Sequence, residues 1–209
     1  MIFFLLGSSA NISAILWNWR LIGSPPFGTM YHVMLFLGAC FLPVYLITVL
    51  HNKTERASFY FPIIASLPII FALFLFKGET WRQPPVLQSV WFIPHVTSYM
   101  LAYSLAIIAF LLNSHRLLVI AFPLMTFGLF SGAIWADGAW ASYWSWSEPK
   151  ETFALITWVL YLTYFHFSKS ARLQKFTRIV HAFAFLSLIA TFLLVNLLPK
   201  LSSSLHSYK

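Results

Sequence analysis

Charged residues are scarce in this chain. Asp, Glu, Lys and Arg make up 9% of its 209 residues, whereas 60% are hydrophobic and the mean hydropathy is +0.79. An average soluble domain contains about 25% charged residues, so this composition excludes a soluble fold. A membrane span needs about 20 apolar residues, which gives the chain room for about seven or eight spans and none for a soluble domain.

Cysteine is almost absent as well. Cys40 is the one cysteine and lies within an apolar run, which excludes a disulfide framework and a Cys-x-x-Cys redox pair. Acidic residues are also few, and the formal net charge is +8. The basic residues occur in short loops between apolar runs rather than along one helix or arm, which favours contact with a membrane surface and not with nucleic acid.

Apolar runs separated by turn residues and charges predict an all-α, polytopic transmembrane helix bundle of about seven spans. We expect a single integral membrane domain over residues 1–209. The first run lacks a basic leader and a clear small-residue cleavage site, which predicts a retained span. Prolines inside two of the runs are expected to kink the helices without breaking them. The predicted spans are residues 2–18, 31–50, 58–76, 95–112, 117–134, 152–167 and 179–198.

The basic residues also predict the orientation. Lys169, Arg172, Lys175 and Arg178 crowd between the last two spans, and loops rich in Lys and Arg face the cytoplasm. The whole-chain balance is only seven basic residues on this side against six on the other, so the prediction depends on this one loop. It places the segments around residues 20–30, 77–94, 135–151 and 199–209 on the outer side.

Tryptophan is concentrated between the fifth and sixth spans, where the sequence reads WADGAWASYWSWSEPKET. Trp135, Trp140, Trp144 and Trp146 fall within this stretch. An aromatic belt at the membrane interface is the simpler interpretation, and composition alone favours it. The alternative is a flat aromatic shelf for a planar macrocycle, because Trp140 and Trp144 would share a face if the loop formed a short helix.

The stretch GAIWADGAWASYWSWSEPKETFALITW resembles the tryptophan-rich signature of the haem-handling protein superfamily, in its CcsA/ResC branch. PPVLQSVWFIPHVTSYMLAYSLAI and NLLPKLSSSLHSYK resemble other segments of that branch. The resemblance implies a haem-handling core over residues 77–209 and leaves the spans of residues 1–76 with a weaker assignment. Two positions depart from the family pattern: Ser147 and Glu148 replace a single Asp, and Ala141 replaces a glycine after Trp140.

The same resemblance implies roles for three of the seven histidines. His95 and His206, in the IPHV and LHSY segments, match the family's axial ligands to the iron of an external haem, and neutral imidazoles suit that role. His166, within the sixth span, matches a ligand of a second haem inside the membrane. From position alone, a hydrogen-bonded polar side chain is the usual interpretation of an interfacial histidine and is favoured for His206, and a side chain that snorkels to the interface is the alternative for His166. His51, His115 and His181 are expected to be solvated or to face lipid headgroups, and His32 matches no ligand motif.

The resemblance implies a subunit of a membrane cytochrome c synthase of the haem lyase type. Haem b would be presented on the periplasmic or lumenal side of a bacterial inner membrane or thylakoid membrane, for thioether attachment to apocytochrome c. A CcsB/ResB-like membrane protein would be the partner. Delivery of haem to a chaperone, as by CcmC-like proteins, is an alternative, and so is a transporter or a structural subunit. A transporter would be expected to carry several charges inside its spans.

Overall fold

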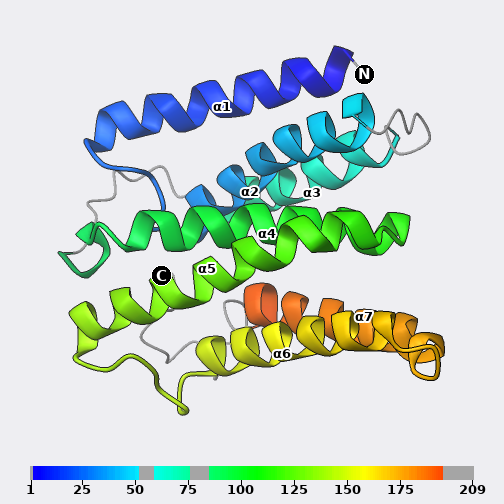
Figure 1. Ribbon diagram of the computed structural model, residues 1–209. Coiled ribbons are helices and arrows are strands. Elements are labelled where there is room, and N and C mark those ends of the chain that lie inside the picture. Colours follow the sequence, from blue (N-terminus) through cyan, green and yellow to red (C-terminus); the bar gives the residue numbers. More distant parts are fainter. Residues whose placement is uncertain (1, 52–58, 76–84, 195–209) are drawn as a thin grey trace.

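The structure is a computed structural model that describes residues 2–51, 59–75 and 85–194 (Figure 1). All regular elements in these ranges are helical, which confirms the predicted all-α bundle. Short 3-10 turns, η3 (Pro85–Gln88) and η4 (Gln174–Phe176), precede α4 and α7, and π-helical segments, η1 (Leu46–His51) and η5 (Ala190–Leu194), extend α2 and α7. The α-helices are α1 (Ile2–Ile22), α2 (Met30–Tyr45), α3 (Tyr60–Leu75), α4 (Phe92–Leu112), α5 (His115–Trp140), α6 (Pro149–Lys169) and α7 (Thr177–Ile189).

The helices lie side by side, and successive helices run in opposite directions (Figure 1). The connections from α1 to α2 and from α5 to α6 therefore lie at the same end of the bundle as the start of α4. We call this the tryptophan end, because it carries residues 135–146. The turns from α4 to α5 and from α6 to α7 lie at the opposite end, which we call the basic end after the cations of residues 169–178.

Large apolar side chains cover much of the outside of the bundle. Phe3, Phe74 and Phe130 are 88%, 83% and 64% exposed. Five helical segments of the described ranges are long and apolar enough to cross a membrane, and the 16-residue α3 is a shorter apolar helix. Such an exterior is compatible with lipid and not with water. The chain is therefore an integral membrane protein.

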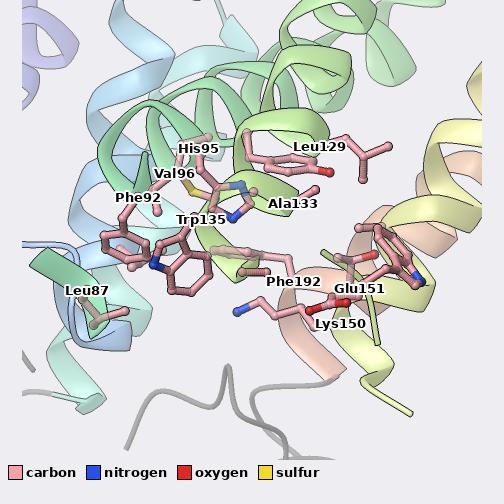
Figure 2. Close-up of a pocket in the computed structure, with 18 of the residues that line it drawn as sticks. Leu87, Phe92, His95, Val96, Leu129, Ala133, Trp135, Lys150, Glu151 and Phe192 are labelled. Carbon is pink, nitrogen blue, oxygen red and sulfur yellow. The ribbon is translucent and has the colours of Figure 1, made fainter. Parts of the chain in front are cut away.

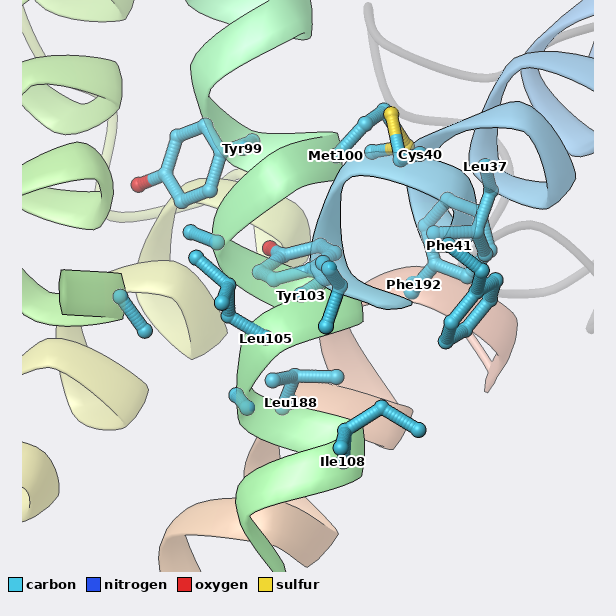
Figure 3. Close-up of a cluster of buried hydrophobic side chains, with 14 of the residues drawn as sticks. Leu37, Cys40, Phe41, Tyr99, Met100, Tyr103, Leu105, Ile108, Leu188 and Phe192 are labelled. Atoms are coloured by element: carbon cyan, nitrogen blue, oxygen red, sulfur yellow. The ribbon is translucent and has the colours of Figure 1, made fainter. Parts of the chain in front are cut away.

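The interior is packed most tightly where α4 meets its neighbours. Cys40 and Phe41 of α2 contribute to an apolar cluster with Met100 of α4, and Leu188 of α7 with Phe192 of η5 extends it (Figure 3). On its other side, α4 packs against α5. A Cβ at Gly128 of α5 would lie 2.8 Å from the Tyr99 ring of α4, so only glycine permits this approach.

The ends of α5 are set by local chemistry. Ser114 is the N-cap, and its side chain accepts a hydrogen bond from the Leu117 amide. Pro123 lies within α5 without ending it, as expected for a helix supported by its neighbours. The helix ends at Trp140 because Ala141 adopts a left-handed conformation with φ of +55°. Glycine adopts this conformation at the lowest energetic cost, so the glycine of the family pattern would suit this position.

This end of α5 corrects one expectation. The span was predicted to stop at about residue 134, and Trp140 and Trp144 would have shared a face if the following loop had formed a short interfacial helix. Instead, α5 continues through Trp135 to Trp140, and residues 141–148 contain no helix. The left-handed Ala141 turns the chain away, so Trp140 and Trp144 come from different segments.

Candidate functional site

A cavity of about 460 Å³ lies at the tryptophan end (Figure 2). Its walls come from α4, α5 and the first turns of α6, with η5 closing the side toward the core. Among its lining residues are four that the sequence had singled out, namely His95, Trp135, Trp140 and Trp144. Residues more than 50 positions apart in the chain thus meet around one space.

His95 is held in a defined orientation. Its Nδ1 lies 2.8 Å from the carbonyl oxygen of Gly128 on α5. A carbonyl can only accept a hydrogen bond, so Nδ1 carries the proton, and Nε2 of the neutral ring keeps its lone pair. A metal-binding histidine is commonly held in this way by a carbonyl on its second nitrogen. A Cβ at Gly132 would lie 2.5 Å from Cε1 of the same ring, so this glycine makes room for the imidazole.

Aromatic side chains form the wall beside His95. The indole of Trp135 stacks on the imidazole, with centroids 5.7 Å apart and an angle of 27° between the planes. Trp140 meets Trp135 edge-on at 4.9 Å. Nε1 of Trp135 donates a hydrogen bond to the Val86 carbonyl oxygen at 2.9 Å, which ties η3 to this wall. The result is a fixed apolar surface suited to a flat ring system.

A cation also lines the cavity. Lys150, in the first turn of α6, extends toward the side that holds Trp135 (Figure 2). Burial lowers the pKa of Lys150 to about 7. Burial also raises the pKa of the adjacent Glu151. A hydrogen bond that the Ser145 amide donates to the Glu151 carboxylate, at 2.6 Å, acts in the opposite direction and lowers this pKa. The cavity therefore combines mostly apolar walls with the basic side chain of Lys150.

The extra residue of the signature, where Ser147 and Glu148 replace a single Asp, is accommodated at the start of α6. Glu148 is buried at the N-cap position, and Pro149 follows at the first helical position, where its missing amide proton has no cost. Glu151 closes the loop through its bond to Ser145. The loop that results leaves Trp146 75% exposed and outside the lining of the cavity, although its ring lies 6.0 Å from that of Trp144.

His206 lies outside the described residues. The pairing of His95 with His206 therefore stays a prediction.

A second cavity, of about 680 Å³, lies at the basic end between α5 and α6. His166 lines it, and so does His115, the first residue of α5. His166 Nδ1 donates to the Leu162 carbonyl oxygen one turn earlier in the same helix, at 3.0 Å, which leaves its Nε2 with a lone pair. His115 Nδ1 lies 3.2 Å from the Tyr164 hydroxyl. The structure thus brings together two histidines, only one of which the sequence had singled out.

Two other histidines, His32 and His181, are buried within the helix bundle. His32 is buried beside Thr29, with its Nδ1 2.7 Å from the threonine hydroxyl at the N-cap of α2. The expectation that His181 is solvated or faces headgroups was wrong. It is 3% exposed and lies edge-on to the Phe110 ring at 5.2 Å, because α7 packs this face against α4 and α6.

The sequence pattern did not indicate Tyr99 and Gly132 as parts of the site. Tyr99 follows His95 by four residues, so the two share a face of α4, and this spacing was the available signal. Gly132 gave no signal of its own, because its role depends on which helix lies opposite.

Comparison with known proteins identifies relatives of this chain. The sequence profile of the family described as Cytochrome C assembly protein matches residues 113–202. The chain is 31% identical to the cytochrome c biogenesis protein CcsA of Chlamydomonas reinhardtii over 93% of its own length and 64% of that protein, so it spans less than two thirds of this relative. It is 30% identical to the CcsA of Mesostigma viride, covering 88% of the chain and 77% of that protein.

Sequence identity to a relative is higher over a shorter region of the chain. Over 96 residues, the chain is 45% identical to the CcsA of Marchantia polymorpha, which covers 46% of the chain and 29% of that protein. The match to Mesostigma CcsA extends over most of both proteins. The chain therefore belongs to the CcsA family of cytochrome c biogenesis proteins.

Proposed function

We propose that this protein holds haem b at the tryptophan end and presents it for covalent attachment to apocytochrome c. The observation that carries the proposal is the orientation of His95. Its Nδ1 proton is bound by the Gly128 carbonyl, and its ring lines an aromatic cavity together with Lys150. An imidazole fixed in this tautomer presents Nε2 as a ligand for iron. His206 is the proposed second axial ligand.

The aromatic wall would fix the plane of the haem. Trp135 and Trp140 are anchored to each other and to η3, so they need little reordering when a ring system enters. Trp144 also lines the cavity. Trp146 is exposed at its rim, where it is available to the incoming apocytochrome or to the membrane interface.

The proposed reaction is an addition that needs no change in oxidation state. A cysteine thiol of the Cys-x-x-Cys-His segment of apocytochrome c adds to a vinyl group of haem. The sulfur bonds to the carbon next to the ring, and the thiol proton ends on the terminal carbon. The histidine of that segment would then replace one of the two protein ligands. Residues of this chain orient the reactants, and the haem supplies the reactivity. The protein would thus act as a subunit of a holocytochrome c synthase.

We further propose a second haem position at the basic end, with His166 as a ligand. Support comes from its Nε2, which is left as an acceptor, and from the adjoining cavity. A CcsB/ResB-like membrane partner would supply the other ligand. The haem-handling core would comprise residues 77–209, with residues 1–76 as supporting spans.

The proposed orientation places the tryptophan end on the periplasmic or lumenal side. Of the described cations, Arg116, Lys169, Arg172, Lys175 and Arg178 cluster at the basic end, whereas Arg20 and Lys150 lie toward the tryptophan end. This distribution favours a cytoplasmic basic end. Labelling of a Ser142→Cys variant by an impermeant thiol reagent in intact cells tests it, and protection until lysis would reverse the orientation.

The direct test of the function is an absorption spectrum. Protein expressed with ample haem and with its membrane partner, then purified in detergent, should show a Soret band. A colourless preparation would refute haem binding and leave an aromatic belt as the explanation of the tryptophans.

A further inference from the structure

Two buried hydrogen-bond donors that lack a partner among the described residues belong to side chains lining the tryptophan-end cavity. They are the hydroxyl of Tyr99 and Nε1 of Trp144. Tyr99 is 6% exposed, and its ring lies edge-on to His95 with centroids 5.2 Å apart. Buried hydrogen-bond donors are nearly always paired, because an unpaired donor has lost its hydrogen bonds to water without replacing them. Two of them in one cavity indicate a ligand that accepts hydrogen bonds.

The direction of the Tyr99 side chain supports this. In Figure 3, its hydroxyl points away from the apolar cluster around Cys40 and Met100. Tyr103, one turn further along α4, lines the same cavity but takes part in other interactions within the fold. The two tyrosines thus form a matched pair on one helix.

The charge in the cavity indicates the kind of acceptor. Lys150 lines it along with the two donors, while most of the remaining wall is apolar or aromatic. A cation with two neutral donors is suited to carboxylate oxygens, which accept several hydrogen bonds each. On haem, the two propionates are the peripheral groups with this chemistry.

We infer that Tyr99 and Trp144 are positioning residues that donate hydrogen bonds to the propionates of haem, beside the charge of Lys150. The inference rests on the proposed function and assigns an orientation to the haem within it. Propionates and vinyl groups occupy opposite edges of the ring. Holding the carboxylate edge at these donors therefore directs the vinyl edge away from them, toward the place where thiols must arrive.

The test compares two iron porphyrins that differ in their carboxylates. Mesohaem carries two propionates, and etiohaem has ethyl groups in their place. Purified wild-type protein should bind mesohaem at least about tenfold more tightly than etiohaem, because charge-assisted hydrogen bonds are lost with the latter. Tyr99→Phe should weaken mesohaem binding roughly tenfold and leave etiohaem binding unchanged. Trp144→Phe should lower the ratio of the two affinities in the same direction, and Tyr103→Phe should preserve it.

Ligand-free protein provides a second measurement. Removing an unpaired hydroxyl should leave the thermal stability of Tyr99→Phe equal to or above that of the wild type. A loss of stability would show that the hydroxyl is bonded within the fold and would overturn the inference. An unchanged affinity ratio in Tyr99→Phe, or equal binding of both porphyrins by the wild type, would overturn it as well while leaving haem binding intact. Binding of neither porphyrin would refute the proposed function itself.

Discussion

The two cavities each contain a histidine whose Nδ1 is bonded to a backbone carbonyl, but the carbonyl differs in origin. At the basic end, His166 bonds to Leu162 in its own helix, four residues earlier. At the tryptophan end, His95 on α4 bonds to Gly128 on α5, 33 residues away. The first orientation needs only a helix, whereas the second needs two helices packed at close range. The site at the tryptophan end, which we call the outer site after its proposed orientation, is therefore the more sensitive of the two to helix packing.

The imidazole at the tryptophan end is also more enclosed than the one at the basic end. His95 is flanked by the rings of Trp135 and Tyr99. His166 is exposed at the edge of its cavity. A ligand at the outer site would meet a preformed wall, while one at the basic end would need further contacts. This difference is consistent with a partner protein completing the basic end.

Removal of an axial ligand should have the largest effect. We expect His95→Gly and His206→Gly each to lower haem affinity at the outer site more than about 100-fold, beyond the roughly 10–100-fold typical of changes to residues that support a metal ligand. Cytochrome c maturation should fall accordingly, and added imidazole should restore part of the binding by entering the opened position. His115→Gly is the control and should leave outer haem unchanged. Normal maturation in both ligand variants would refute the assignment.

His166→Gly should separate the two cavities. The second haem that we propose at the basic end should be lost or shift its redox state, because one of its proposed imidazole ligands is removed, while the outer haem spectrum persists. Spectra and haem content per protein distinguish the two results. Equal loss at both ends would mean that the sites are not independent.

Gly132→Ala should disturb the outer site through packing alone. Its Cβ would collide with the His95 ring, so the imidazole or α5 must shift. We expect roughly 10–100-fold weaker haem binding, as for other supporting residues of metal sites. Gly138→Ala, on the same helix, has open space around its Cβ and should bind normally. Equal haem affinity in the two variants would contradict the described position of His95.

Haem affinity at the outer site should also depend on pH through Lys150. Its lowered pKa, about 7, means that the free protein carries this charge below pH 7 and loses it above. If the charge contacts a propionate, affinity should be level just below pH 7 and fall by up to about tenfold per pH unit above it. Lys150→Arg keeps its charge and should flatten this decline in a binding titration between about pH 6.5 and 9, because a guanidinium stays protonated throughout. A decline that survives in Lys150→Arg would have another origin.

The smallest expected effect concerns the turn between α5 and α6. Ala141→Gly should stabilise the protein by about 1 kcal/mol, because glycine adopts the left-handed conformation without the strain of a Cβ. Ala139→Gly, inside α5, should instead destabilise it by a similar amount. Unfolding midpoints of the ligand-free variants measure both. A destabilised Ala141→Gly would show that the methyl group makes contacts of greater value than the strain.

Composition and hydropathy by themselves determined the all-α membrane bundle and approximate helix positions, since a span needs a long apolar run whatever its neighbours are. The tryptophan-rich segment was likewise enough to indicate the family, because its residues are contiguous in the chain. The hydropathy pattern did not predict where α5 ends. The helix continues to Trp140 and stops there because Ala141 adopts a left-handed conformation.

Only the tertiary structure decided how the outer site is built. No sequence spacing relates His95 to Gly128 and Gly132, because their contact depends on how two helices cross and which faces meet. The same holds for His181, which α7 packs against α4 and α6 despite its place beside a basic loop. Side-chain chemistry is local and can be read along the chain. Which of these groups lose contact with water, and which face one cavity, follows from packing between distant segments.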